Sequence, residues 1–276
     1  MAFATSWQMF KTSAAVLKSR KELAVFPVFS AVASVLVAAT FIVPIIANDV
    51  WHKSSTMTYV LFGLMYLVSA FVTIFFNAAL ISQANVALQG GDPDVAEGLR
   101  AAGARSPQIL VWAVISATVS QALRWLQDRV PFLGMILAAI AGTAWQVVTF
   151  LVLPKIVLED RNVVAAVKDS SAALKRTWGE NLAGNAGLGL FGLLFALPGI
   201  LVMFVGFLML GTGTDAVAGL AVIALGIAWL MATGVIVSAL SGIYQTALYR
   251  YSVDGSAPVA FATADLSQSF RRRGRR

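Results

Sequence analysis

Few residues in this sequence have a type and spacing that could do chemistry. His52 is the only histidine and stands between Trp51 and Lys53, while Glu159 and Asp160 form an adjacent acidic pair. A single histidine lacks the partners that a metal site or a nucleophilic triad requires. Paired acids in a turn before a helix more often stabilise the positive end of that helix. We therefore predict no catalytic residue, no metal site and no cofactor, and we expect that the protein is not an enzyme.

The composition indicates what solvent the chain needs. Its 276 residues are 59% hydrophobic and only 12% charged, whereas soluble domains carry about 25% charged residues. A chain this apolar could not cover its own surface with polar groups, so a bilayer is the expected solvent. The absence of cysteine excludes disulfides and thiolate-ligated metals. The net charge of +7 is typical of basic residues facing anionic headgroups, and nucleic acid is not expected as a partner.

Hydropathy divides the chain into candidate spans. A membrane-spanning helix needs about 20 apolar residues to cross about 30 Å of hydrocarbon. Six runs are long enough, at about 23–47, 57–81, 107–126, 131–153, 182–210 and 216–240. We predict an all-α membrane protein with six transmembrane helices as three hairpins and with interfacial amphipathic helices on the cytoplasmic side. Residues 23–245 would form the membrane domain, 1–22 a cytoplasmic amphipathic helix, and 246–276 a cytoplasmic amphipathic segment with a basic tail.

The distribution of Lys and Arg predicts the orientation of these spans. With the amino terminus inside, seventeen of the 20 basic residues fall in inner segments and three in outer segments. Such an excess marks the cytoplasmic side of a membrane protein. An even number of spans then places both termini in the cytoplasm.

The inner ends of the second helix of each hairpin align without gaps, and the hairpins recur about every 80 residues. The aligned stretches are 82–93, 152–163 and 247–258. The fourth residue of each stretch is polar: Asn85, Lys155 and Arg250. A helix-start signal follows, and we expect Asp92 to cap one helix and Asn162 to cap the next. The sequence thus predicts three repeated units, each with its own short amphipathic helix.

The clearest amphipathic stretch is at the amino terminus. Its apolar face contains Phe3, Trp7, Phe10, Ala14 and Leu17, at helical spacing. Lys11 and Lys18 flank this face, and a second stripe of this kind begins at Val163. Such helices lie in the headgroup plane with their charges in water, or they pack against the inner ends of the spans. We expect both kinds of contact here.

Polar residues inside the spans leave two interpretations open. No ionisable residue lies well inside the six runs, which argues against an ion-driven pump. Uncharged polar side chains could form interhelical hydrogen bonds of about 0.6 kcal/mol each, or they could line a polar inner vestibule. The candidate vestibule residues are Asn77, Gln83, Gln146, Asn185 and Gln245.

Basic residues on the inner side are the expected contacts to lipid. Each Lys or Arg near an anionic surface contributes about 1 kcal/mol of binding free energy. The candidate contacts to anionic lipid are Lys11, Lys18, Lys21, Lys155, Arg176, Arg271, Arg272 and Arg273. Membrane lipids are therefore the expected partners, and a second membrane protein could bind at the same face.

Two stretches carry a resemblance to known families. Residues Ser6–Ser30 resemble the opening of an uncharacterised bacterial family of integral membrane proteins of unknown function. Residues Leu153–Ser170 are similar to a segment of the membrane domain attached to some glycerophosphodiester phosphodiesterases. The resemblance implies a six-helix membrane domain with this order of hairpins and amphipathic helices. It implies no catalytic residue, because the phosphodiesterase chemistry of those relatives lies in a separate soluble domain.

Two functions fit these observations. The first is a multi-pass protein of the bacterial plasma membrane that organises lipid or partner proteins at the inner face without catalysing a reaction. The alternative is a permease or channel for a small or amphiphilic solute, without charge coupling inside the membrane. A polar cavity that reaches the midplane would favour the alternative, whereas a dry, closely packed centre would favour the first.

Overall fold

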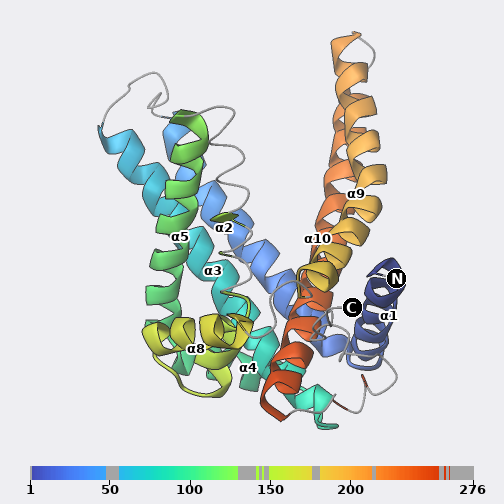
Figure 1. The fold of residues 1–276 in the computed structure, drawn as a ribbon. Helices are drawn as coiled ribbons and strands as arrows, with labels where there is room; N and C mark the ends of the chain where they lie inside the picture. The colour runs from blue at the N-terminus through green and yellow to red at the C-terminus, as the bar shows by residue number, and fades with distance from the viewer. Residues whose placement is uncertain are drawn as a thin grey trace.

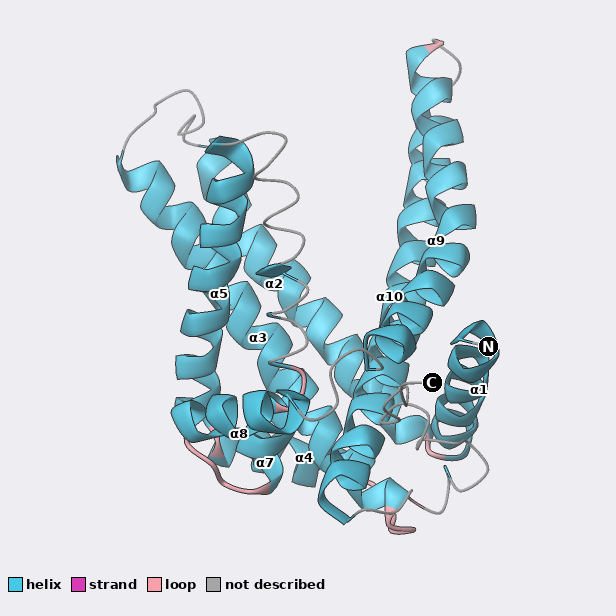
Figure 2. Ribbon diagram, in the orientation of Figure 1, coloured by secondary structure: helices cyan, strands magenta, loops and turns pink. Residues whose placement is uncertain are grey.

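A computed structural model describes residues 2–47, 56–129, 141–142, 145, 149–175, 181–212, 216–254, 258 and 261. Within these residues every regular element is a helix, and no strand occurs (Figure 2). The all-α expectation is confirmed for this part of the chain. The helices are α1 (Ala2–Ser19), η1 (Lys21–Ala24), α2 (Val25–Ala47), α3 (Thr56–Leu88), α4 (Val95–Ala104), α5 (Ser106–Arg129), α7 (Val152–Leu158), α8 (Val163–Lys175), α9 (Asn181–Gly211) and α10 (Ala216–Asp254).

Five helical stretches among the described residues are long and apolar enough to cross a membrane. They are Lys21–Pro44, Tyr59–Leu88, Ser106–Leu126, Gly192–Gly211 and Ala216–Asp254. These stretches coincide with five of the six predicted spans. The remaining prediction, 131–153, lies mostly outside the described residues, so the count of six and the arrangement as three hairpins stay predictions.

The short helices gather at one end of the molecule, and the long helices extend away from it (Figure 1). The core lies at this end, where Phe26, Leu80, Ile156 and Tyr244 are fully buried. Along the other end the α9–α10 pair diverges from α2, α3 and α5 (Figure 1). We call the core-containing end the base.

The long helices beyond the base carry apolar side chains on their outer surfaces. Val35 of α2, Phe204 of α9 and Leu225 of α10 are 55%, 57% and 64% exposed. Large exposed apolar surfaces of this extent mark contact with a membrane or a partner. Helix α10 has 39 residues, or about 58 Å at 1.5 Å per residue, and so exceeds a hydrocarbon core of about 30 Å. Its last turns therefore belong to the base.

Two turns at the base support the predicted repeat. Helix α3 ends at Leu88, Gly90 in the turn that follows has φ +87°, and the amide of Gly91 donates to the carbonyl of Val86 at 3.0 Å. This pairing closes a helix with a left-handed residue after its last turn. Asp160, which occupies the aligned position after α7, also has a positive φ of 55°. Aspartate is one of the few residues other than glycine that adopts this conformation readily.

Each short helix packs on a long helix or helix end at the base. Helix α4 contacts α3, and α8 contacts α7 and α5. Helix α1 contacts α9 and α10, although it is the first element of the chain and they are the last. The base is thus closed by contact between the two ends of the sequence.

Candidate functional site

The three aligned inner ends meet at the base. Helix α10 contacts both α3 and α7, and α3 contacts α7. The guanidinium Nε of Arg250 donates to the side-chain oxygen of Asn85 at 2.5 Å. The alignment of these two positions, 165 residues apart, therefore corresponds to a direct contact. We call the polar group formed by Asn85, Lys155, Glu159, Tyr249 and Arg250 the helix-exit junction.

Glu159 is the centre of the helix-exit junction. Its carboxylate accepts a hydrogen bond from the Tyr249 hydroxyl at 2.9 Å and pairs with Lys155 Nζ at 3.3 Å. Arg161 Nε approaches the other oxygen at 3.5 Å. The Lys155 and Glu159 side chains are only 13% and 25% exposed, so solvent screens their attraction less than at an open surface. The hydrogen bond from Tyr249 to Glu159 joins the end of α7 to the inner end of α10.

Two further ion pairs each join a residue just before a helix to an aspartate in the turn after a different helix. Arg20, just before η1, pairs with Asp92 in the turn after α3. Arg105, just before α5, pairs with Asp160 in the turn after α7. Asp92 was expected to cap a helix, and that expectation is wrong. Asp94, whose backbone is extended, is instead the N-cap of α4, and its side chain accepts from the amide of Glu97 at 2.8 Å.

The second predicted cap is confirmed. The side-chain oxygen of Asn162 accepts from the amide of Ala165 at 2.8 Å, at the start of α8. An N-cap of this kind satisfies one of the backbone donors that a helix start leaves open.

The described candidate vestibule residues take part in helix contacts. Gln83 is buried, and its side-chain oxygen accepts from the amide of Asp94 at 2.9 Å. The Gln245 amide nitrogen donates to the carbonyl of Phe150. Asn77 is half-buried on the face of α3 that approaches Gly242 of α10. Asn185 lies on α9, where only its backbone is described, and Gln146 lies outside the described residues.

The candidate lipid contacts are divided between surface and junction. Lys11, Lys18 and Lys21 are exposed, and α1 contains no acidic residue. Lys155 instead lies in the helix-exit junction, which favours a structural role for it. The other candidates, Arg176, Arg271, Arg272 and Arg273, lie outside the described residues, as does His52.

A close contact of α4 provides the first testable prediction. A Cβ atom at Gly98 would lie 2.5 Å from Cζ of the buried Phe26 and 2.8 Å from Cγ of Gln83. We expect Gly98→Ala to lower the free energy of unfolding by about 1–2 kcal/mol, because the core at this point has no room for a methyl group. Thermal unfolding in detergent measures the change. The matched control is Gly103→Ala on the same helix, where a Cβ atom meets nothing within 4 Å; equal melting temperatures for the two variants would contradict the prediction.

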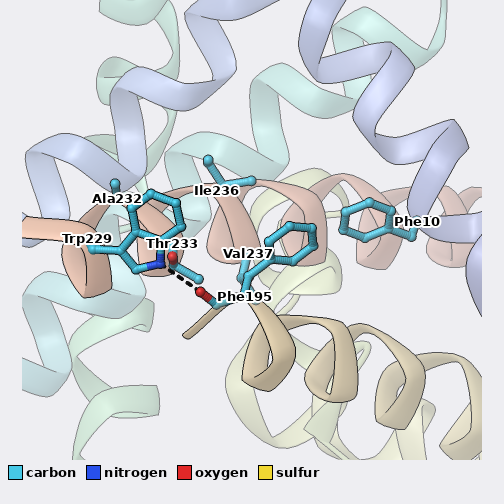
Figure 3. A pocket seen from close by; sticks show the side chains of 7 residues that line it. All are labelled: Phe10, Phe195, Trp229, Ala232, Thr233, Ile236 and Val237. Atoms are coloured by element: carbon cyan, nitrogen blue, oxygen red, sulfur yellow. Dashed lines mark hydrogen bonds between the residues drawn. The ribbon is translucent and has the colours of Figure 1, made fainter. Parts of the chain in front are cut away.

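A cavity of about 360 Å³ lies between α1, α9 and α10 (Figure 3). We call it the α1 groove. It is lined by Phe10, Phe195, Trp229, Ala232, Thr233, Ile236 and Val237. The rings of Phe10 and Phe195 stack with centroids 6.1 Å apart, and the Trp229 indole nitrogen donates to the carbonyl of Phe195 at 2.8 Å. Sequence analysis placed Phe10 on an apolar stripe, but no signal connected it with residues almost 200 positions away.

A second cavity, of about 340 Å³, lies between α3 and α5. Five of its lining residues carry a hydroxyl group, and these are Tyr66, Ser69, Thr73, Ser116 and Ser120. The Thr73 hydroxyl donates to the carbonyl of Ser69 on its own helix at 2.9 Å. The guanidinium carbon of Arg124 lies 5.6 Å from the centre of the Tyr66 ring.

The contacts of the helix-exit junction favour a structural role. Its one carboxylate, that of Glu159, is contacted by Tyr249, Lys155 and Arg161, and the bond to Tyr249 connects two helices. Among the residues that the structure describes, no three His, Cys, Asp or Glu side chains are placed to bind a metal ion. The expected absence of catalysis, metal and cofactor stays a prediction.

Comparison with known proteins gives one family match. A family model described as a family of unknown function, DUF6159, matches residues 56–259, which is more than half of the chain. The matched range takes in the helix-exit junction and both helices of the α9–α10 pair. No curated protein and no solved structure matches the chain.

Proposed function

The chain belongs to DUF6159, a family of unknown function, and from its contacts we propose that it organises anionic lipid at the inner face of a bacterial plasma membrane. On this proposal it is a non-enzymatic, multi-pass protein with six spans and both termini in the cytoplasm. The same face would hold any membrane-protein partner. Its similarity to the membrane domain of glycerophosphodiester phosphodiesterases belongs to the proposal and concerns that domain alone.

The position of α1 carries the proposal. This helix packs on α9 and α10 at the base, so its position relative to the long helices is fixed by the protein. Lys11 and Lys18 are its only charged residues, and both are exposed. Trp7 is 38% exposed, with Lys11 Nζ 5.2 Å from the centre of its ring. A tryptophan beside lysines on an amphipathic helix is typical of the headgroup layer.

Charge removal on this surface tests the proposal. We expect the triple variant Lys11→Gln, Lys18→Gln, Lys21→Gln to retain anionic phospholipid up to about a hundredfold less strongly than the unmodified protein. The figure follows from about 1 kcal/mol per basic residue and from a factor of ten for each 1.4 kcal/mol. Mass spectrometry of phospholipid that co-purifies with the full-length protein measures the ratio of anionic to zwitterionic lipid.

The matched control keeps the charge. The variant Lys11→Arg, Lys18→Arg, Lys21→Arg is expected to retain anionic lipid as the unmodified protein does. If the glutamine and arginine variants carry the same lipids, the basic surface of α1 and η1 does not select them and the proposal fails.

The hydroxyl-lined cavity between α3 and α5 favours the alternative, a permease for a small neutral solute. Uncharged hydroxyl groups could replace part of the water around such a solute inside the membrane. The hydrogen bonds of Gln83 and Gln245 to neighbouring backbone favour the lipid-organising role instead, since those amides are held by the packed base. Flux of glycerol into liposomes that contain the protein separates the two, and we expect no flux above that of empty liposomes.

A further inference from the structure

We propose that the α1 groove holds one acyl chain of an anionic phospholipid, whose headgroup lies beside Lys11. This inference deepens the proposed function and rests on it for the identity of the headgroup. It adds a defined site for the acyl chain, built from α1 and from the α9–α10 pair, which lies far from α1 in the sequence.

The walls of the groove suit a hydrocarbon chain. Phe10 comes from α1, Phe195 from α9, and the rest of the lining from one face of α10 (Figure 3). Apart from the Thr233 hydroxyl and the Trp229 indole nitrogen, the lining side chains are apolar. That indole N–H is already bonded to the Phe195 carbonyl. The volume of about 360 Å³ falls within the roughly 300–1,000 Å³ of ligand pockets.

The shape of the groove is set before any ligand binds. A Cβ atom at Gly199 would lie 2.7 Å from Cδ1 of Trp229, so glycine at this position lets the indole lie close against α9. The Trp229 indole N–H donates to the carbonyl of Phe195 on α9 at 2.8 Å. The wall is therefore fixed by a hydrogen bond and a close glycine contact.

The location of the groove argues for a lipid as its occupant. Ala232 and Ile236 are exposed on a stretch of α10 that is apolar enough to cross a membrane. Exposed apolar side chains at that position face acyl chains in a bilayer. At the α1 side, the ring of Phe10 stacks on that of Trp7 with centroids 5.4 Å apart, and Lys11 Nζ lies 5.2 Å from the centre of the Trp7 ring. The apolar groove therefore has a cation near its α1 wall, on a helix that contains no acid, as one acyl chain and its anionic headgroup would require.

A photoactivatable lipid tests this site. The full-length protein is placed in liposomes that contain phosphatidylglycerol with a diazirine near the end of one acyl chain, and labelled residues are located by mass spectrometry after irradiation. We expect label to concentrate at Phe195 and between Trp229 and Val237. Ala232→Phe, which fills the groove, is expected to lower labelling at Phe195 at least fivefold, whereas Ile236→Ala, which widens it, keeps the labelling.

The control is Ala224→Phe, at another exposed alanine of α10 that does not line the groove. This variant is expected to be labelled at Phe195 like the unmodified protein. Equal labelling at Phe195 in the Ala232→Phe and Ala224→Phe variants would overturn the inference, as would label spread evenly over the exposed faces of α9 and α10. Cross-linking of the groove to another protein in place of lipid would overturn it too.

The experiment tests the headgroup preference and the acyl-chain site separately. The same photoactivatable acyl chain is also presented on phosphatidylcholine. If groove labelling is equal for both headgroups, the preference for anionic lipid fails while the chain site stands. If phosphatidylglycerol is retained preferentially but labels no groove residue, the chain site fails while the proposed function stands.

Discussion

Replacing Gly226 by alanine is expected to lower the free energy of unfolding by about 3 kcal/mol, because the new methyl group would overlap the backbone of α9. A Cβ atom at Gly226 would lie 2.8 Å from the amide nitrogen of Met203 and 2.9 Å from the carbonyl oxygen of Gly199. Neither atom can rotate away as a side chain could, so the two helices must separate. The loss of packing then extends along the hairpin.

The contact at Gly226 is one of a pair. About two turns further along α9, a Cβ atom at Gly206 would lie 2.9 Å from the carbonyl oxygen of Gly219 and 2.9 Å from the amide nitrogen of Ile223. Close backbone approach through small residues is a common way for membrane helices to associate, because lipid gives little hydrophobic drive for it. The α9–α10 pair is therefore held by glycine contacts at two levels.

The effect is measured by unfolding the purified protein in mixed micelles with increasing sodium dodecyl sulfate. The control is Gly234→Ala on the same helix, where a Cβ atom meets nothing within 4 Å. That variant is expected to be neutral or more stable by up to about 1 kcal/mol, because alanine favours helix over glycine. Coincident unfolding curves for the two variants would show that the hairpin does not depend on close approach at Gly226.

Replacing Glu159 by glutamine is expected to cost about 2–3 kcal/mol of stability, because it leaves the mostly buried Lys155 ammonium without its counter-charge. Glutamine has nearly the same shape and can still accept the hydrogen bond of Tyr249. The loss therefore reports on the charge at the helix-exit junction and not on packing. The same detergent titration gives the free energy.

The matched control is Asp169→Asn. Asp169 lies 3.8 Å from Arg161, with side chains that are 40% and 54% exposed, and an exposed pair of this kind contributes at most about 1 kcal/mol. A larger loss in the Asp169→Asn variant than in Glu159→Gln would contradict the central position of Glu159.

Among the described residues, hydropathy locates five helices that are long and apolar enough to cross a membrane, but it does not locate the ends of those helices. The last span was predicted to end near residue 240, yet α10 continues to Asp254. Beyond 240 one face of the helix, including Tyr244 and Ala247, is buried in the base, while Gln245 and Arg250 make polar contacts. The average hydropathy falls there although the helix goes on, because protein replaces lipid around it.

Contacts between distant helices are harder to predict than the helices. The alignment of inner ends placed Asn85 and Arg250 at equivalent positions, and they are bonded. It did not indicate that Glu159 would bind Tyr249, because that depends on how far each helix is rotated. The spacing of seven residues between Gly199 and Gly206, and between Gly219 and Gly226, is visible in the sequence. Which neighbour those glycines meet is decided only by the folded arrangement.

In the candidate site, too, local features were predictable and contacts between distant helices were not. The exposed lysines of α1 were anticipated from an amphipathic pattern, which is local. The α1 groove was not, because it exists only when Phe10 meets Phe195 and Trp229. Its lining on α10 falls at helical spacing, but apolar residues surround that helix on other faces too, so the spacing alone does not mark this face.

The docking of α1 on α9 and α10 also sets the order of events as the protein is made. Phe10 leaves the ribosome early, but its stacking partner Phe195 follows about 185 residues later, which at roughly 5–20 residues per second is a delay of about 10–40 s. During that time the amphipathic helix has the membrane surface as its alternative contact. A nascent chain therefore reaches its final form only after α9 and α10 have been made, because α1 packs on both of them.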